Sequence, residues 1–264
     1  DDGSSDMMMM MAWRVVAARQ LQLQLTANSR TCASFFLKIM RQSSSKAWMK
    51  RHVNDKYVKE AKSSNYRSRS AFKLLEIQEK HKIFRLGDNV FDLGAAPGGW
   101  SIVAHESIHK KRGKHSQNKR QPPAGGRYGL VVGIDLLPIQ PTRGVHFIQG
   151  DIRDPEVQRH AQEMLLPSEK AHIVISDMAP NLSGHRDMDH FRSIQLCTDA
   201  LDFAIEVLKP GGTFLCKFFK GRDEGELRAA LRRRFTDVAL LKPRASRKES
   251  SEAYFLARRF LPPP

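Results

Sequence analysis

Short apolar runs alternate along this chain with stretches in which apolar residues recur every three or four positions. Six runs predict buried strands, because they are too short for core helices. They lie at residues 89–93, 130–134, 145–148, 171–175, 213–219 and 253–257. Helical spacing predicts helices over residues 67–78 and 191–208, and we expect Pro210, Gly211 and Gly212 to end the second helix.

Alternating strands and helices indicate an α/β fold, with a mostly parallel sheet and helices on both faces. Asp92, Asp135 and Asp177 stand at the ends of three predicted strands, and Asp151 follows a fourth. The carboxyl ends of parallel strands share one edge of a sheet, and ligands bind beyond that edge. We therefore expect a row of carboxylates beside a ligand site.

The amino-terminal part of the chain differs from the rest in composition. No acidic residue occurs between Met7 and Asn54, where eight Arg and Lys residues are mixed with Ser, Thr and apolar residues. This composition predicts a disordered mitochondrial transit leader over residues 1–42, and hence a location in the matrix. A basic arm that contacts RNA is the alternative. Residues 1–6 fit neither interpretation, and residues 43–264 are expected to form a single domain.

The formal net charge of +16 concerns the partners of the protein rather than its fold. Nucleic acid is the first candidate partner and an anionic membrane the second, although a generic solubilising surface would also be basic. A basic insertion at residues 107–128 carries seven Lys and Arg residues and no acid, so it predicts a loop that contacts phosphate or serves as a solvated spacer. No apolar run approaches the roughly 18 residues of a membrane span.

Three cysteines, Cys32, Cys197 and Cys216, show neither close pairing nor metal-ligand spacing. A disulfide framework and a zinc site are therefore disfavoured. Cys197 and Cys216 lie within apolar patterns and are interpreted as small core residues. We expect no metal in this protein.

The stretch FDLGAAPGGW, at residues 91–100, places a loop of small residues directly after a predicted strand. A dinucleotide site would require G-x-G-x-x-G, whereas Pro97 removes an N–H where phosphate donors are expected. The loop therefore favours a nucleoside cofactor without phosphates, such as S-adenosylmethionine, over a nicotinamide dinucleotide. Asp135 could accept both ribose hydroxyls, and Asp151 could reach the adenine edge. A tight turn without a ligand is the plain alternative.

Seven blocks occur in an order that resembles the FtsJ/RrmJ family of ribosomal RNA 2′-O-methyltransferases. They are DKYVKEA, RSRSAFKLLEI, DLGAAPGGWS, GIDLLP, SDMAPNLSG, LKPGGTFLCKFF and SRKESSEAYFLA. The resemblance implies a Rossmann-like S-adenosylmethionine-dependent methyltransferase fold. It further implies cofactor contacts at Gly94, Ala95, Pro97, Gly98, Gly99, Trp100, Asp135, Asp151, Ile152 and Asp177. GHRDMDH and ASRKESSEAYFLA are most similar to the mitochondrial branch, which methylates a uridine of large-subunit rRNA.

The family uses a Lys-Asp-Lys-Glu tetrad, which the resemblance places at Lys73, Asp177, Lys217 and Glu252. The residues themselves single out two of these positions. Lys217 is a charge within an apolar strand, where a lysine is costly unless it is paired or reaches water at the strand end. Asp177 follows an apolar strand at the ligand edge, where a turn residue is the alternative. We expect Lys217 to accept the proton of the ribose hydroxyl.

Basic residues flank this tetrad in the sequence and predict contacts with RNA phosphates. The candidates are Lys56, Arg67, Arg69, Arg244 and Arg247. The expected partner is large-subunit rRNA or a pre-ribosomal particle, bound by a monomer. An rRNA-binding assembly factor that keeps the fold without chemistry is the competing hypothesis, and a nicotinamide dehydrogenase is a weaker one.

Overall fold

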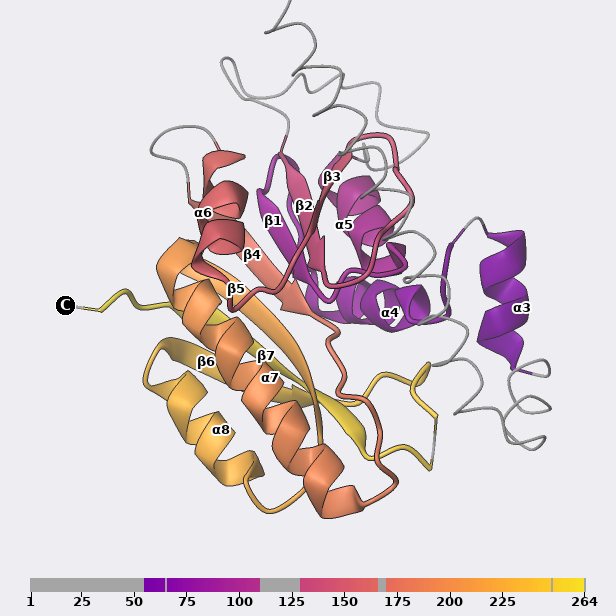
Figure 1. Ribbon diagram of the computed structural model, residues 1–264, viewed down its shortest axis with the longest axis vertical. Coiled ribbons are helices and arrows are strands. Elements are labelled where there is room, and N and C mark those ends of the chain that lie inside the picture. The colour runs from indigo at the N-terminus through magenta and orange to yellow at the C-terminus, as the bar shows by residue number, and fades with distance from the viewer. Residues whose placement is uncertain (1–54, 65, 110–128, 166–169, 248, 264) are drawn as a thin grey trace, which may run out of the picture. The chain divides into compact units, whose positions relative to one another are not determined.

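The computed structural model describes residues 55–64, 66–109, 129–165, 170–247 and 249–263 (Figure 1). From Lys56 onward the chain forms one compact unit around a seven-stranded sheet of order β3-β2-β1-β4-β5-β7-β6. Its strands are β1 (Val90–Leu93), β2 (Val131–Asp135), β3 (Val145–Gln149), β4 (Ala171–Ser176), β5 (Leu208–Phe219), β6 (Phe235–Leu241) and β7 (Glu252–Phe260).

Five neighbouring strands, from β3 to β5, are parallel, so the predicted mostly parallel α/β sheet is confirmed. The last strand of the chain, β7, lies between β5 and β6 and runs antiparallel to both. This insertion places the first residues of β7 beside the carboxyl end of β5. The first residues of β7 therefore lie at the same edge of the sheet as the last residues of the parallel strands, where the ligand is expected.

Helices cover both faces of the sheet, as Figure 1 shows. The helices of the described segments are α3 (Lys56–Ser63), α4 (Ala71–His81), α5 (Gly99–His109), α6 (Pro155–Glu163), α7 (Arg186–Val207) and α8 (Glu224–Arg232), of which α3 lies to the side of the sheet (Figure 1). Buried residues of α4 and α5 pack on one face, and those of α6, α7 and α8 on the other. Successive residues of β1 serve the two faces, because Val90 joins the first core and Phe91 the second.

Local signals explain some element boundaries and mislead at others. Asp154 caps α6 by accepting a hydrogen bond from the amide of Glu156, and Pro155 occupies the first turn. The predicted end of the second helix is confirmed within one residue, because α7 ends at Val207 just before the Pro-Gly-Gly sequence. The next strand begins earlier than the predicted residue 213, because β5 starts at Leu208 and residues 210–212 lie inside it. The pairing of β4 with β5 shifts register at that place, which accommodates the irregular sequence within the strand.

Parts of the predicted organisation fall outside the described residues, including the leader at 1–42 and Cys32. In the basic insertion, residues 107–109 form the end of α5, and 110–128 lie outside the description. Cys197 and Cys216 are buried core residues as expected. Over the segments that the structure describes, no helix is long and apolar enough to cross a membrane, and no group of three metal-ligating side chains is found.

Candidate functional site

The loop between β1 and α5 is shaped by contacts within the protein itself. Gly94 has a φ of 73°, and a Cβ atom there would lie 2.5 Å from Cγ of Met178. Gly98 has a φ of 105°, and its Cβ would lie 3.0 Å from the guanidinium of Arg67. Both glycines therefore satisfy a backbone conformation that other residues rarely adopt, at positions where neighbouring segments press closely on the loop.

Arg67 ties this loop to the segment that follows β2. Its guanidinium donates hydrogen bonds to the carbonyl oxygens of Pro97 at 3.2 Å, Gln140 at 2.5 Å and Pro141 at 2.9 Å. An arginine predicted to hold RNA thus has a structural task, which the sequence did not reveal. Its contact with phosphate stays a prediction, since the residue is exposed.

Asp135, at the end of β2, braces the same loop from the other side. One carboxylate oxygen accepts the amide of Ala96 at 2.9 Å, and the other accepts the amide of Leu137 at 2.8 Å. Each oxygen keeps a second lone pair, and the side chain is only partly buried. Asp135 can therefore also accept the two hydroxyls of a ribose, as the sequence suggested.

The remaining predicted cofactor residues divide into buried and accessible positions. Ala95, Gly99, Trp100 and Ile152 are buried, whereas Pro97 is exposed. Asp151 is half-buried and forms a two-pronged ion pair with Arg153, whose guanidinium approaches to 2.6 Å and lowers the pKa of the carboxyl. Contact of these residues with a cofactor stays a prediction. For Asp151, a ligand would have to share the carboxylate with Arg153.

Asp92 was predicted only as one of the acids at the strand ends, with no role of its own. It is fully buried in β1, where one oxygen accepts the hydroxyl of Ser101 at 2.6 Å and the other has no hydrogen-bond partner among the described residues. Burial, together with the charges of Asp177 and Asp135, raises its pKa to about 7. The only signal in the sequence was an acid within an apolar run.

The acidic residues at the carboxyl ends of β1, β2 and β4 fit a cationic nucleoside cofactor. The carboxylates of Asp135 and Asp177 lie close enough to Asp92 to raise its pKa, so three acidic side chains are gathered at this edge of the sheet. A sulfonium and an ammonium group, as in S-adenosylmethionine, would be attracted there, and pyrophosphate would be repelled. The residues present therefore fit S-adenosylmethionine better than a dinucleotide.

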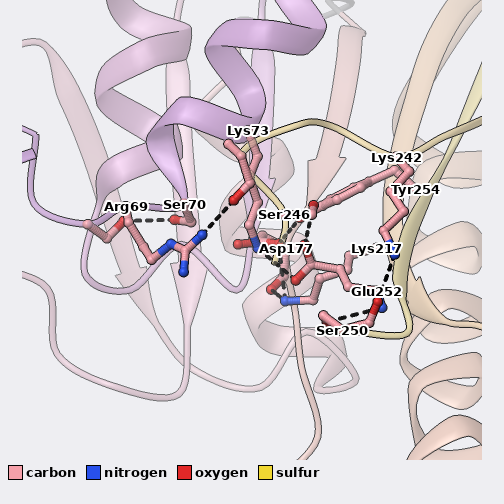
Figure 2. A network of polar contacts seen from close by, with 12 residues as sticks. Arg69, Ser70, Lys73, Asp177, Lys217, Lys242, Ser246, Ser250, Glu252 and Tyr254 are labelled. Carbon is pink, nitrogen blue, oxygen red and sulfur yellow. Dashed lines mark hydrogen bonds and ion pairs between the residues drawn. The ribbon is translucent and has the colours of Figure 1, made fainter. Parts of the chain in front are cut away.

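Next to this edge the structure brings the predicted tetrad together from four segments (Figure 2). Nζ of Lys217 lies 3.1 Å from Oδ1 of Asp177 and donates to the carbonyl oxygen of the same residue at 2.6 Å. Nζ of Lys73 lies 2.7 Å from Oε2 of Glu252. Lys73, Lys217 and Glu252 are 9%, 8% and 8% exposed, so both ion pairs are largely withdrawn from water.

The electrostatics of the tetrad are dominated by these pairs. Burial alone would raise the pKa of Glu252, but the positive charges of Lys73 and Lys217 and a hydrogen bond from Ser246 at 2.8 Å hold that pKa below its usual value. Glu252 is therefore an anion at neutral pH, as is required of a carboxylate that holds a lysine in place.

Tyr254 is a residue that sequence reasoning missed. Its phenol donates to Oδ1 of Asp177 at 2.9 Å, and its ring stacks on Trp100 with centroids 5.8 Å apart. Nζ of Lys73 lies 6.0 Å from the centre of the same ring. Burial and the charge of Asp177 raise the pKa of Tyr254 well above its usual value. This tyrosine thus links the glycine-rich segment to both ion pairs.

The other predicted RNA contacts lie on α3, before α4 and in the loop between β6 and β7. Arg69 donates to the carbonyl oxygen of Ala245 at 2.5 Å, which holds the amino end of α4 beside the loop between β6 and β7. That loop carries Arg244, which is exposed, and Arg247, which is half-buried. Lys56 is exposed on α3 and forms an ion pair with Glu60 at 3.5 Å. A role in RNA binding stays a prediction for all four basic residues.

Comparisons with known proteins identify a family profile, two relatives and a solved structure that resemble this chain. A sequence profile of FtsJ-like methyltransferases matches residues 66–260. The ribosomal RNA large subunit methyltransferases E of Brucella ovis and Brucella anthropi are 43% and 44% identical over 219 residues, which cover 83% of this chain and 85% of each relative. A crystal structure titled as a ribosomal RNA methyltransferase from Plasmodium falciparum superposes with a TM-score of 0.62 at 27% identity, over 75% of this chain and 100% of that one.

Proposed function

Because this chain belongs to the FtsJ-like methyltransferase family, we propose that it transfers a methyl group from S-adenosylmethionine to a ribose 2′-hydroxyl. The observation that carries the proposal is the position of Lys217. Its amine is held by Asp177, and Met178, the next residue, packs against Gly94 of the glycine-rich loop. Two consecutive residues, Asp177 and Met178, therefore contact the candidate base and the candidate cofactor loop respectively.

The mechanism follows from the two ion pairs. The bound cofactor supplies a sulfonium-linked methyl group, which is already a strong electrophile. Lys217 accepts the proton from the 2′-hydroxyl, and Asp177 fixes the direction of its amine. Glu252 interacts electrostatically with Lys217 and forms an ion pair with Lys73 at 2.7 Å, so one carboxylate lies close to both lysines of the tetrad. Alignment of the hydroxyl with the methyl carbon supplies several kcal/mol of the barrier reduction.

The proposed substrate is a uridine of mitochondrial large-subunit rRNA. The Brucella relatives carry the name of large-subunit rRNA methyltransferases, and the net charge of +16 suits an RNA partner. The uridine and the mitochondrial matrix rest on the resemblance of GHRDMDH and ASRKESSEAYFLA to the mitochondrial branch and on the composition of the leader. Free rRNA and a pre-ribosomal particle are alternative forms of this proposed substrate.

The decisive experiment measures methyl transfer from labelled cofactor to large-subunit rRNA, followed by mapping of 2′-O-methyl sites. Replacement of Lys217 with Ala should abolish transfer while calorimetry still detects cofactor binding. Lys220→Ala is the matched control, because Lys220 is an exposed lysine three residues further along. Full transfer by the Lys217 variant would remove this residue from its role.

The competing hypothesis of a non-catalytic assembly factor makes a different prediction. Such a protein would bind rRNA tightly without modifying it. The complete tetrad, with both pairs formed at 2.7 and 3.1 Å, favours catalysis instead. Tight RNA binding without any label transfer by the wild-type protein would decide for the assembly factor.

A further inference from the structure

Four arginines gather at the end of the antiparallel part of the sheet that lies away from the tetrad. These residues, which we term the distal arginine cluster, are Arg232, Arg233, Arg234 and Arg259. The strand register fixes their position. Phe219 of β5 pairs with Glu252 at one end of β7, and Phe235 of β6 pairs with Phe260 at the other. Figure 1 shows the end of β7 and the end of α8 on the side opposite the loop that precedes β7.

The arginines of this cluster lack acidic partners, unlike their neighbours on the same elements. Arg228 of α8 pairs with Glu224 at 2.9 Å, and Arg258 of β7 pairs with Asp237 at 2.6 Å. No side chain of the distal cluster forms a hydrogen bond or ion pair with another residue that the structure describes. Three of its members are exposed and Arg234 is half-buried. Four clustered positive charges are thus available to an external anion.

The backbone at this place is also unusual. Arg259 has a φ of 62°, a left-handed conformation that costs a residue other than glycine about 1 kcal/mol. The strand pairs on either side are Asp237 with Arg258 and Phe235 with Phe260, so the strained residue lies between two fixed positions. Retained strain at an exposed charged residue favours a binding role over a neutral surface.

We propose that the distal arginine cluster binds phosphate groups of the same RNA whose ribose reaches the tetrad. This inference rests on the proposed function and extends it. Strand β7 has 9 residues, so its two ends lie roughly 27 Å apart at about 3.3 Å per residue. An RNA that occupies both ends must be large enough to wrap around the antiparallel part of the sheet. The preferred substrate is therefore a long folded rRNA or a particle rather than a short fragment.

The test compares two sets of substitutions with full-length large-subunit rRNA as the probe. The first is a triple variant in which Arg232, Arg233 and Arg259 are all replaced by Gln. In the control, Arg228→Gln and Arg258→Gln remove arginines that already have acidic partners. We expect the first variant to bind rRNA at least about tenfold more weakly and to lower the slope of log affinity against log salt by roughly 2 to 3, with the rate at saturating RNA unchanged. The control variant should stay near wild type.

Additional measurements distinguish a loss of RNA contacts from misfolding and from membrane binding. Cofactor affinity by calorimetry shows that the variant is folded, and the single substitution Arg233→Gln should show a smaller loss of the same kind. The difference in RNA affinity between the triple variant and the wild-type protein should disappear when a short rRNA fragment replaces the full-length rRNA. An unchanged salt slope would overturn the proposal, and so would loss of binding to anionic vesicles with rRNA binding intact. If the wild-type protein does not methylate rRNA, the proposed function is wrong. The comparison of rRNA binding between the two variants would still show whether the distal arginine cluster contacts RNA.

Discussion

Lys217 and Tyr254 are direct partners across the β5–β7 pair, and both reach the same carboxylate oxygen. Oδ1 of Asp177 lies 3.1 Å from the lysine amine and 2.9 Å from the phenol. Opposite residues of antiparallel strands project from the same face of a sheet, so the register of β7 determines this meeting. A one-residue slip of β7 would turn Tyr254 to the opposite face of the sheet from Lys217. The orientation of the candidate base therefore depends on a strand pairing as much as on the tetrad residues.

Replacement of Tyr254 with Phe should test that dependence. The ring and its stacking on Trp100 are kept, and only the hydrogen bond to Asp177 is lost. We expect a fall of roughly 1 kcal/mol in the free energy of unfolding and a lower rate of methyl transfer at saturating substrates. Chemical denaturation and single-turnover assays measure the two effects. The matched control is Tyr66→Phe, which removes a phenol that donates to Glu106 outside the tetrad. Equal rates for both variants would contradict a positioning role.

The buried pair of Lys73 and Glu252 should show strong coupling in a double-mutant cycle. Removing either partner leaves a charge that is largely withdrawn from water, so each single change, Lys73→Met or Glu252→Gln, should cost about 3 kcal/mol of unfolding free energy. The double variant should cost clearly less than the sum, because neither charge is left alone. Urea denaturation of the four proteins provides the measurement. Additive costs would mean that the two side chains do not stabilise each other.

Asp92 should make stability depend on pH in an unusual direction. Its pKa is raised to about 7 from the usual aspartate value of 3.8, so the folded state retains a proton that the unfolded state releases between these values. Stability contributed by the protonated group is thus complete below about pH 4 and lost as the pH rises to 7. Asp92→Asn should stabilise the protein at pH 8, by no more than about 4 kcal/mol, and have little effect at pH 4. Urea unfolding at the two pH values measures the effect, and a gain independent of pH would refute the assignment.

Gly94→Ala should disrupt the candidate cofactor loop. The new methyl group would lie 2.5 Å from Cγ and 3.0 Å from Cα of Met178, and the φ of 73° is unfavourable for alanine. We expect at least about tenfold weaker binding of S-adenosylmethionine by calorimetry, since a shift of the loop also moves the segment after Asp177. Gly225→Ala is the control, because a Cβ atom at this position of α8 would meet nothing within 4 Å. That change should instead stabilise the helix by roughly 0.5–1 kcal/mol.

Much of the parallel half of the fold follows from the sequence. The runs at residues 89–93, 130–134, 145–148 and 171–175 correspond to β1, β2, β3 and β4 within one or two residues. Strands β1, β2 and β4 are almost entirely buried and therefore leave a clear apolar signal. The apolar signal of strand β6 and of helix α8 in the sequence is weaker. Strand β6 lies at the sheet edge with only Phe235 buried, and α8 buries only Leu227 and Leu231.

The candidate site was predictable in its residues but not in its connections. The tetrad positions came from the family resemblance, and the structure places all four together. Tyr254 was missed because an aromatic residue in an apolar strand is ordinarily a core residue, and its role depends on the antiparallel position of β7. Arg67 was assigned to RNA alone because its contacts with Gln140 and Pro141 span more than seventy positions of sequence. Long-range contacts of this kind leave no local pattern.

The position of β7 also bears on how the protein acquires activity during synthesis. The strand that carries Glu252 and Tyr254 comes last in the chain, yet it fills the gap between β5 and β6. A nascent chain that has not yet released these residues has open edges on β5 and β6 and lacks the part of the candidate site that β7 supplies. Methyl transfer competence is therefore gained in one late step, and products terminated before residue 252 should be both inactive and prone to aggregate.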